Sequence, residues 1–204
     1  MLSMRSLPNM LGLFRILTTP LLVWLIWHNT PNDYLWAVLL LLAMAISDIV
    51  DGPIARRLHV VSPLGVFLDT ISDKIFVTGA LIPMVEGGII PGWIAFIIIV
   101  RDFFVSGLRS FAATEGVVIS AGKWGKQKLV ITVVVLIWVL LDASAQRGGW
   151  LGTLFGGLLL PLLNLWIIPM GLALIWTIGS AFDYLRQAWP LLRGHWTPTS
   201  RDDA

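Results

Sequence analysis

The sequence predicts an all-α, polytopic integral membrane protein with six transmembrane helices. Of its 204 residues, 57% are hydrophobic and only 13% are charged, and its mean hydropathy of +0.84 lies well above that of soluble globular domains. Several apolar stretches approach or exceed the roughly 20 residues that a helix needs to cross a bilayer. We therefore predict one membrane domain over residues 1–190 and a polar cytoplasmic tail over residues 191–204.

Six spans follow one another along the chain, each placed by its apolar length and polar flanks. They cover residues 11–28, 35–57, 63–85, 93–113, 124–141 and 160–184. Ahead of the first span, the break at Pro8-Asn9 suggests a short interfacial helix over residues 1–10. The Gly-rich, partly apolar segment between the last two spans is compatible with a long loop, an interfacial helix or an extension of the sixth span.

The distribution of Lys and Arg predicts the orientation of the chain. Most of them fall on one side of the six-span arrangement, whereas the opposite loops HNTPNDY and EGGIIPG contain none and a third contains Arg147. By the positive-inside rule, both termini then lie in the cytoplasm, and we expect a bacterial inner membrane protein. The small net charge of +2 and the absence of a long basic run argue against a nucleic-acid partner. Because the chain has no Cys, disulfides, thiolate metal sites and cysteine nucleophiles are excluded.

Acidic residues inside the predicted spans are the main indication of function, because ionised side chains are costly there and usually functional. Five of the ten aspartates lie in the second to fourth spans: Asp102 in the fourth, and Asp48, Asp51, Asp69 and Asp73 in the second and third. The spacing of the latter four places them on one helix face in each of two consecutive spans. These faces consist of Asp48, Asp51, Gly52, Ala55 and Arg56 in the second span, and of Gly65, Asp69 and Asp73 in the third. The short link LHVVS makes the two helices antiparallel neighbours, so the four carboxylates are expected to converge near the cytoplasmic end.

Four converging carboxylates indicate a cation site, because without counterions they repel each other. Two divalent cations would neutralise them, and a ligand set made only of oxygen suits Mg²⁺ or Mn²⁺. Such metal pairs recur in displacement reactions at phosphorus, and Gly52 and Gly65 let a phosphate or nucleotide approach the helix backbone. For any single Asp, a buried ion pair or a proton relay is the alternative. From another class of function, the alternative is an ion-coupled transporter.

Residues 48–73 read D-x2-D-G-x2-A-R-x8-G-x3-D-x3-D. This pattern resembles the full signature of the CDP-alcohol phosphotransferase family of membrane phospholipid synthases. The resemblance implies a dimeric six-helix protein that transfers a phosphatidyl group from CDP-diacylglycerol to an alcohol and releases CMP. It also implies that Asp48, Asp51 and Asp69 bind metal and that Asp73 is both a metal ligand and the catalytic base. The implied CDP pocket consists of Gly52, Ala55, Arg56 and Gly65.

Basic residues in and after the fourth span bear on the identity of the alcohol. Arg101 and Arg109 share one helix face, and the following link contains GKWGKQK. Such residues suit an acceptor that carries its own phosphate. The alternative is that Arg101 pairs with Asp102 and that the lysines only set the topology.

The motifs around the signature are similar to those of the phosphatidylglycerophosphate synthase branch of the family. They are PNMLGLFR near the N-terminus, SGLR at 106–109, the following AATEG, and GK at 125–126. This resemblance covers roughly residues 8–130 and implies sn-glycerol 3-phosphate as the acceptor, with Arg101, Arg109 and Lys126 as its phosphate ligands. The pattern departs from that of the branch at Asp102, Leu129 and Thr70. Inositol phosphate, or phosphatidylglycerol to make cardiolipin, therefore stays open as an alternative acceptor.

Overall fold

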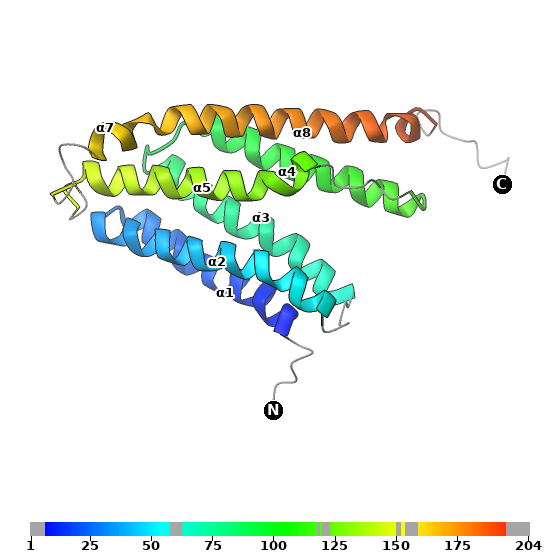
Figure 1. Ribbon diagram of the computed structural model, residues 1–204, viewed down its shortest axis with the longest axis horizontal. Coiled ribbons are helices and arrows are strands. Elements are labelled where there is room, and N and C mark those ends of the chain that lie inside the picture. The colour runs from blue at the N-terminus through cyan, green and yellow to red at the C-terminus, as the bar shows by residue number, and fades with distance from the viewer. Residues whose placement is uncertain are drawn as a thin grey trace.

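The computed structural model describes residues 7–57, 63–117, 119, 123–149, 152–153 and 159–194, and over these the elements of regular structure are helices. They are α1 (Leu7–His28), α2 (Pro31–Arg57), α3 (Pro63–Glu86), α4 (Gly92–Thr114), α5 (Lys123–Gln146), α7 (Leu159–Leu163), the 3₁₀ helix η2 (Asn164–Trp166) and α8 (Ile167–Gly194). In Figure 1 the long helices form two groups, α1 to α3 and α4, α5 and α8. The groups meet where α5 packs on α2 and α4 packs on α3.

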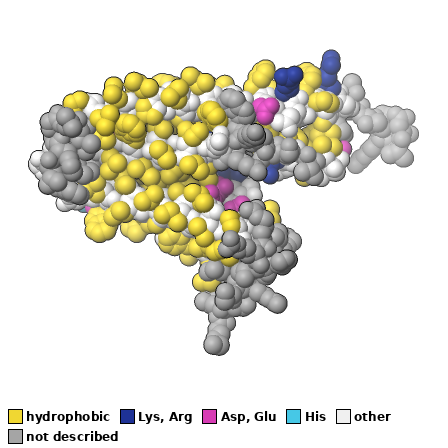
Figure 2. Space-filling view, in the orientation of Figure 1, with side chains coloured by type: hydrophobic (Ala, Val, Ile, Leu, Met, Phe, Trp, Pro, Cys, Tyr) yellow, Lys and Arg dark blue, Asp and Glu magenta, His cyan; other side chains and the backbone are white. Residues whose placement is uncertain are grey.

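Four helices in the described part of the chain are long and apolar enough to cross a membrane. They cover Asn9–His28, Pro31–Ile54, Gln127–Gln146 and Leu160–Gly194. Large hydrophobic side chains are exposed along their outer faces, and Figure 2 shows hydrophobic atoms covering most of one face. The prediction of an all-helical integral membrane protein is thus confirmed. Helices α3 and α4 have similar lengths, 24 and 23 residues, but carry several charged residues, so a count of six spans stays a prediction.

The helix boundaries differ from the predicted spans mainly at the two ends of the chain. Residues 7–10, predicted to belong to a separate interfacial helix, lie in the first turns of α1. Pro8 is tolerated there because the first N–H groups of a helix have no intrahelical acceptor. At the other end, α5 continues to Gln146, and α7 and η2 lead into α8, which runs to Gly194. Residues 1–6 and 195–204 lie outside the described residues.

Helix α1 lies at the centre of its group, because it packs against both α2 and α3 while these two make few contacts with each other. Two glycines allow α1 and α3 to approach closely, as small residues do in membrane helices. A Cβ added at Gly12 would lie 3.2 Å from Leu68 Cβ, and one added at Gly79 would lie 2.4 Å from Thr19 Cγ2. The close approach brings Arg15, one turn after Gly12, to the acidic face of α3.

Candidate active site

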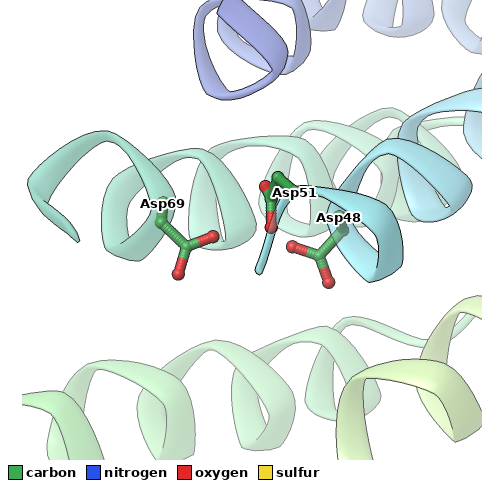
Figure 3. Close-up of side chains that lie close together, drawn as sticks. All are labelled: Asp48, Asp51 and Asp69. Atoms are coloured by element: carbon green, nitrogen blue, oxygen red, sulfur yellow. The ribbon is translucent and has the colours of Figure 1, made fainter. Parts of the chain in front are cut away.

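Four aspartates from α2 and α3 form a carboxylate cluster. Asp48 and Asp51 lie in the last three turns of α2, and Asp69 and Asp73 lie in the first three turns of α3. One oxygen atom from each of Asp48, Asp51 and Asp69 lies within 4.8 Å of the others, and Figure 3 shows these three carboxylates turned toward one another. The predicted convergence is therefore present for these three residues, although α2 and α3 make few direct contacts with each other.

Arg15 of α1 joins the four carboxylates. Its Nη1 donates to Asp48 and, at 3.1 Å, to Asp73. Its Nη2 donates to Asp51 at 2.7 Å and to Asp69 at 3.1 Å. The Arg15 side chain is fully buried, at 0% exposure. Helix α1 thus lies between the two acidic helices and supplies the cation that holds their side chains together.

Arg15 was not predicted as a site residue, since from the sequence alone it is one of the basic residues that indicate the orientation of the chain. The signal was its position inside the first predicted span, where a charged residue usually faces the interior of the bundle and finds a partner. Four acidic residues in the next two spans were the available partners. Charge balance among the spans would therefore have assigned Arg15 to the cluster.

The donor set of the cluster fits a hard divalent cation. All four side chains offer carboxylate oxygens, which Mg²⁺ and Mn²⁺ prefer, and Arg15 balances only one of the four negative charges. The side chains of Asp48 and Asp51 are 15% and 10% exposed, whereas those of Asp69 and Asp73 are 52% and 33% exposed. The cluster therefore has a buried side on α2 and an accessible side on α3.

A cavity of about 270 Å³ opens next to the accessible side of the cluster. Asp69 and Asp73 line it from α3, and α4, α5 and α8 supply the other walls. Its basic lining residues are Lys74, Arg101, Arg109 and Lys128. In Figure 2 acidic and basic side chains appear in the hollow between two blocks of hydrophobic surface. One cavity thus joins the acidic cluster to a group of cations.

Asp102 lies among these cations. We call the group formed by Lys74, Arg101, Arg109 and Lys128 with Asp102 the basic cluster. Asp102 accepts from Arg101 Nη1 at 3.2 Å and from Lys128 Nζ through both of its oxygens. Arg101 Nη2 also donates to Ser180 Oγ of α8 at 2.8 Å, and its guanidinium lies 5.8 Å from the ring centroid of Tyr184. The alternative pairing of Arg101 with Asp102 is thus present, and both residues still line the cavity.

The other predicted site residues lie on the expected helices. Gly52 follows Asp51 in α2, and Gly65 lies one turn before Asp69 in α3. The side chains of Ala55, Arg56 and Lys126 lie outside the part of the structure that is described. The cavity adds residues that were not predicted as ligands, which are Lys74, Lys128, Ser106 and Tyr184. Of these, Lys128 had a signal, because it belongs to the same GKWGKQK segment as Lys126.

The fold and the site together define a class of protein. It is a helical membrane protein in which a carboxylate cluster suited to metal ions lies beside a cavity lined by cationic side chains. Such an arrangement suits reactions of phosphate esters in the membrane. Residues 5–178 match the family model described as CDP-alcohol phosphatidyltransferase, and the chain belongs to this family. The resemblance of the signature residues is thereby confirmed. So is the predicted class of enzyme, a phosphatidyltransferase of phospholipid biosynthesis.

Curated relatives cover nearly the whole chain. It is 30% identical to the CDP-diacylglycerol–glycerol-3-phosphate 3-phosphatidyltransferase of Bacillus subtilis (strain 168), over 93% of this chain and 98% of the relative. It is 31% identical to the enzyme of the same name from Pseudomonas fluorescens, over 92% of each. It is also 32% identical to the cardiolipin synthase (CMP-forming) of Streptomyces coelicolor (strain ATCC BAA-471 / A3(2) / M145), over 48% of this chain and 46% of the relative.

Proposed function

We propose that the chain transfers the phosphatidyl group of CDP-diacylglycerol to sn-glycerol 3-phosphate, forming phosphatidylglycerophosphate and CMP. The observation that carries this proposal is the single cavity lined both by carboxylates of the cluster and by the basic cluster. A metal-activated phosphoanhydride and a phosphorylated acceptor need these two kinds of lining side by side. The names of the two relatives that cover over 90% of the chain support the same acceptor.

The carboxylate cluster would hold two divalent cations, Mg²⁺ or Mn²⁺, at the reacting phosphoanhydride. Asp48, Asp51, Asp69 and Asp73 are the ligands. When bound, such ions withdraw negative charge from the phosphoanhydride and stabilise the departing CMP. Gly52, Ala55, Arg56 and Gly65 line the neighbouring CDP pocket, since they continue the same helix faces.

Asp73 accepts the proton of the acceptor hydroxyl. Like Asp69, it contacts Arg15 and lines the cavity, and the resemblance of the signature residues assigns the role of base to Asp73. The hydroxyl oxygen attacks the phosphatidyl phosphorus, the bond from that phosphorus to the CMP oxygen breaks, and the proton moves to the carboxylate. General bases of this kind contribute roughly 10²- to 10⁴-fold to the rate.

The basic cluster binds the phosphate of the acceptor. Arg101 and Arg109, which line the cavity, are the proposed ligands together with Lys126 of the GKWGKQK segment. Lys74 and Lys128 add positive charge to the cavity. Arg forks suit the tetrahedral oxygens of a phosphate. Asp102 orients Arg101 and Lys128 through its two oxygens, so these two cations are already positioned before the acceptor arrives.

The chain crosses the bacterial inner membrane six times in this proposal, with α3 and α4 as the two spans added to the four long apolar helices. Residues 1–190 form one membrane domain, both termini and the active site face the cytoplasm, and the protein is a homodimer. Support for the orientation comes from the Lys and Arg distribution. A cysteine-accessibility scan of α3 and α4 in closed membrane vesicles and light scattering in detergent test the span count and the dimer.

The decisive experiment is an assay of the purified protein with CDP-diacylglycerol, Mg²⁺ and labelled glycerol 3-phosphate. We expect CMP release, a labelled lipid, and loss of both when EDTA removes the metal. Inositol phosphate and phosphatidylglycerol serve as competing acceptors. A product from either of these but none from glycerol 3-phosphate would overturn the proposed acceptor. If no acceptor released CMP, the transfer reaction itself would be wrong and ion-coupled transport would be the better interpretation.

A further inference from the structure

Arg15 is buried at the centre of the carboxylate cluster, and the proposed reaction gives it no role. We propose that Arg15 is a substrate-binding residue that divalent cations release. Without metal its guanidinium is the counterion of the cluster, and with metal bound it leaves the carboxylates and binds a phosphate of the nucleotide-activated lipid. This inference rests on the proposed function, since it assigns a ligand to the same substrate.

Arg15 and a metal ion need the same oxygen atoms. The guanidinium contacts one oxygen of each carboxylate, namely Oδ1 of Asp48, Oδ2 of Asp51, Oδ1 of Asp69 and Oδ1 of Asp73. Asp48, Asp51 and Asp69 also bring one oxygen each within 4.8 Å of the others, as the ligands of one metal ion would be placed. Mg²⁺ binds oxygens at about 2.0–2.1 Å, so it would have to lie where the guanidinium nitrogens now lie. Like charges at such distances repel strongly, and the two cations therefore exclude each other.

Charge balance gives the reason for the exchange. One guanidinium leaves three of the four negative charges of the cluster uncompensated, which is costly on its buried α2 side. Two divalent cations compensate all four, and the positive charge of Arg15 is then in excess. Arg stays protonated in proteins, so it cannot lose this charge and needs another anion.

The phosphates of the activated lipid are the anion that the site itself brings to Arg15. In this proposal the phosphates bind at the metals, within reach of the Arg15 side chain on the neighbouring helix α1. The planar guanidinium group of Arg suits phosphate oxygens. The Nε atom of Arg15 is buried and has no acceptor among the described residues, so the side chain retains an unused donor. The backbone of Arg15 belongs to α1, where its carbonyl accepts from Thr19, so only the side chain has to move.

A purely structural ion pair makes the opposite prediction. If Arg15 only fixed the geometry of the four aspartates, its removal would spread the carboxylates and weaken metal binding. If it competes with the metal, its removal strengthens metal binding. The sign of the change in metal affinity therefore separates the two roles without any measurement of catalysis.

The first test is a titration of the substrate-free protein in detergent with Mn²⁺, with free Mn²⁺ followed by electron paramagnetic resonance. We expect Arg15→Gln to bind Mn²⁺ about 5- to 100-fold more tightly than the wild type, a range typical of coupled binding equilibria. Arg147→Gln is the matched control, because Arg147 lies at the far end of α5 and packs over the Tyr34 ring. Unchanged or weaker binding by Arg15→Gln, with the control equal to the wild type, would overturn the proposal.

Arg15→Lys keeps the test decisive if the Gln variant does not fold. Lys retains the positive charge but cannot bridge two pairs of carboxylates with a planar fork. We expect its Mn²⁺ affinity to lie between those of the wild type and Arg15→Gln. An affinity equal to or below that of the wild type would contradict competition.

The second test addresses the phosphate. At saturating Mn²⁺, Arg15→Gln is expected to raise the KM for CDP-diacylglycerol by about 10- to 100-fold, which corresponds to the loss of charged hydrogen bonds, and to leave the KM for the acceptor unchanged. An unchanged KM for CDP-diacylglycerol would overturn phosphate binding by Arg15. A wild-type protein that released no CMP would instead contradict the proposed function, while the Mn²⁺ titration would still decide whether Arg15 competes with metal.

Discussion

The two charged clusters beside the cavity have opposite compositions. In the carboxylate cluster, four aspartates surround one cation, Arg15. In the basic cluster, one carboxylate, Asp102, holds Arg101 and Lys128, while Lys74 and Arg109 line the same cavity. Each cluster thus contains a single internal counterion and keeps an excess of charge of one sign, negative in the first and positive in the second. We infer that the first binds cations and that the second binds an anion.

The clusters also differ in how they are built. The carboxylate cluster depends on α1, α2 and α3, with glycines at the close contact of α1 and α3, and its central residue is fully buried. The basic cluster is spread over α3, α4 and α5, with Ser180 and Tyr184 of α8 packed behind Arg101. Changes in the first should therefore affect kcat and the assembly of the site, whereas changes in the second should affect the KM of the acceptor.

The largest effect is expected from Asp73→Asn. Asn keeps the shape of the side chain but cannot accept the proton, so kcat should fall by about 10²- to 10⁴-fold. CMP release by purified protein measures the loss, and circular dichroism in detergent checks that the helices are retained. Asp183→Asn is the matched control, because Asp183 lies on α8 and accepts from Gln187 instead of facing the cluster. Activity near that of the wild type in Asp73→Asn would remove Asp73 as the base.

Arg109→Ala tests the basic cluster, the second of the two clusters compared. Arg109 lines the cavity and is exposed, so its loss should raise the KM for glycerol 3-phosphate by about 10- to 100-fold through lost charged hydrogen bonds, with kcat little changed. Steady-state kinetics at saturating CDP-diacylglycerol give both constants. Arg193→Ala, at the end of α8 against Trp189, should behave as the wild type. A fall in kcat without a change in KM would contradict a binding role.

Gly79→Ala tests whether α1 and α3 must pack closely to build the carboxylate cluster. The added Cβ would lie 2.4 Å from Thr19 Cγ2, and such overpacking typically costs about 1–3 kcal/mol. Gly171→Ala in α8 is the control, because nothing lies within 4 Å of an added Cβ there and Ala favours a helix more than Gly does. We expect thermal unfolding in detergent at a lower temperature for Gly79→Ala only. Equal unfolding temperatures would show that α1 tolerates a wider spacing.

Helix type and order could be predicted from the sequence because each helix needs a long apolar stretch, and those stretches are visible locally. The acidic cluster could be predicted because the spacing of Asp48, Asp51, Asp69 and Asp73 places them on faces of two consecutive helices. The close packing of α1 on α3 could not be predicted in the same way. It depends on Gly12 and Gly79, whose role appears only once the opposite helix is in place.

The basic cluster was predicted in part. Arg101 and Arg109 share a helix face, which the sequence reveals, and both line the cavity. Ser180 and Tyr184 come from α8, more than 70 residues along the chain from Arg101. A Ser and a Tyr in an apolar helix are common without any function, so no local pattern separates them from ordinary packing residues.

The smallest effect is expected from Ser180→Ala, which removes a hydrogen-bond acceptor of Arg101 and leaves the charge of Arg101 unchanged. Ser180 Oγ accepts from Arg101 Nη2 at 2.8 Å and is fully buried, so its loss leaves one donor of Arg101 without this acceptor. A hydrogen bond to a charged group is worth about 1.5–3 kcal/mol. Because Arg101 keeps its contact with Asp102, we expect only part of this energy to be lost from acceptor binding, which corresponds to a rise of roughly 2- to 12-fold in the KM for glycerol 3-phosphate. Ser110→Ala, at an exposed position of α4, is the control. If Ser180 acts through Arg101, Ser180→Ala has no further effect once Arg101 is Ala, whereas additive effects would mean that Ser180 acts separately.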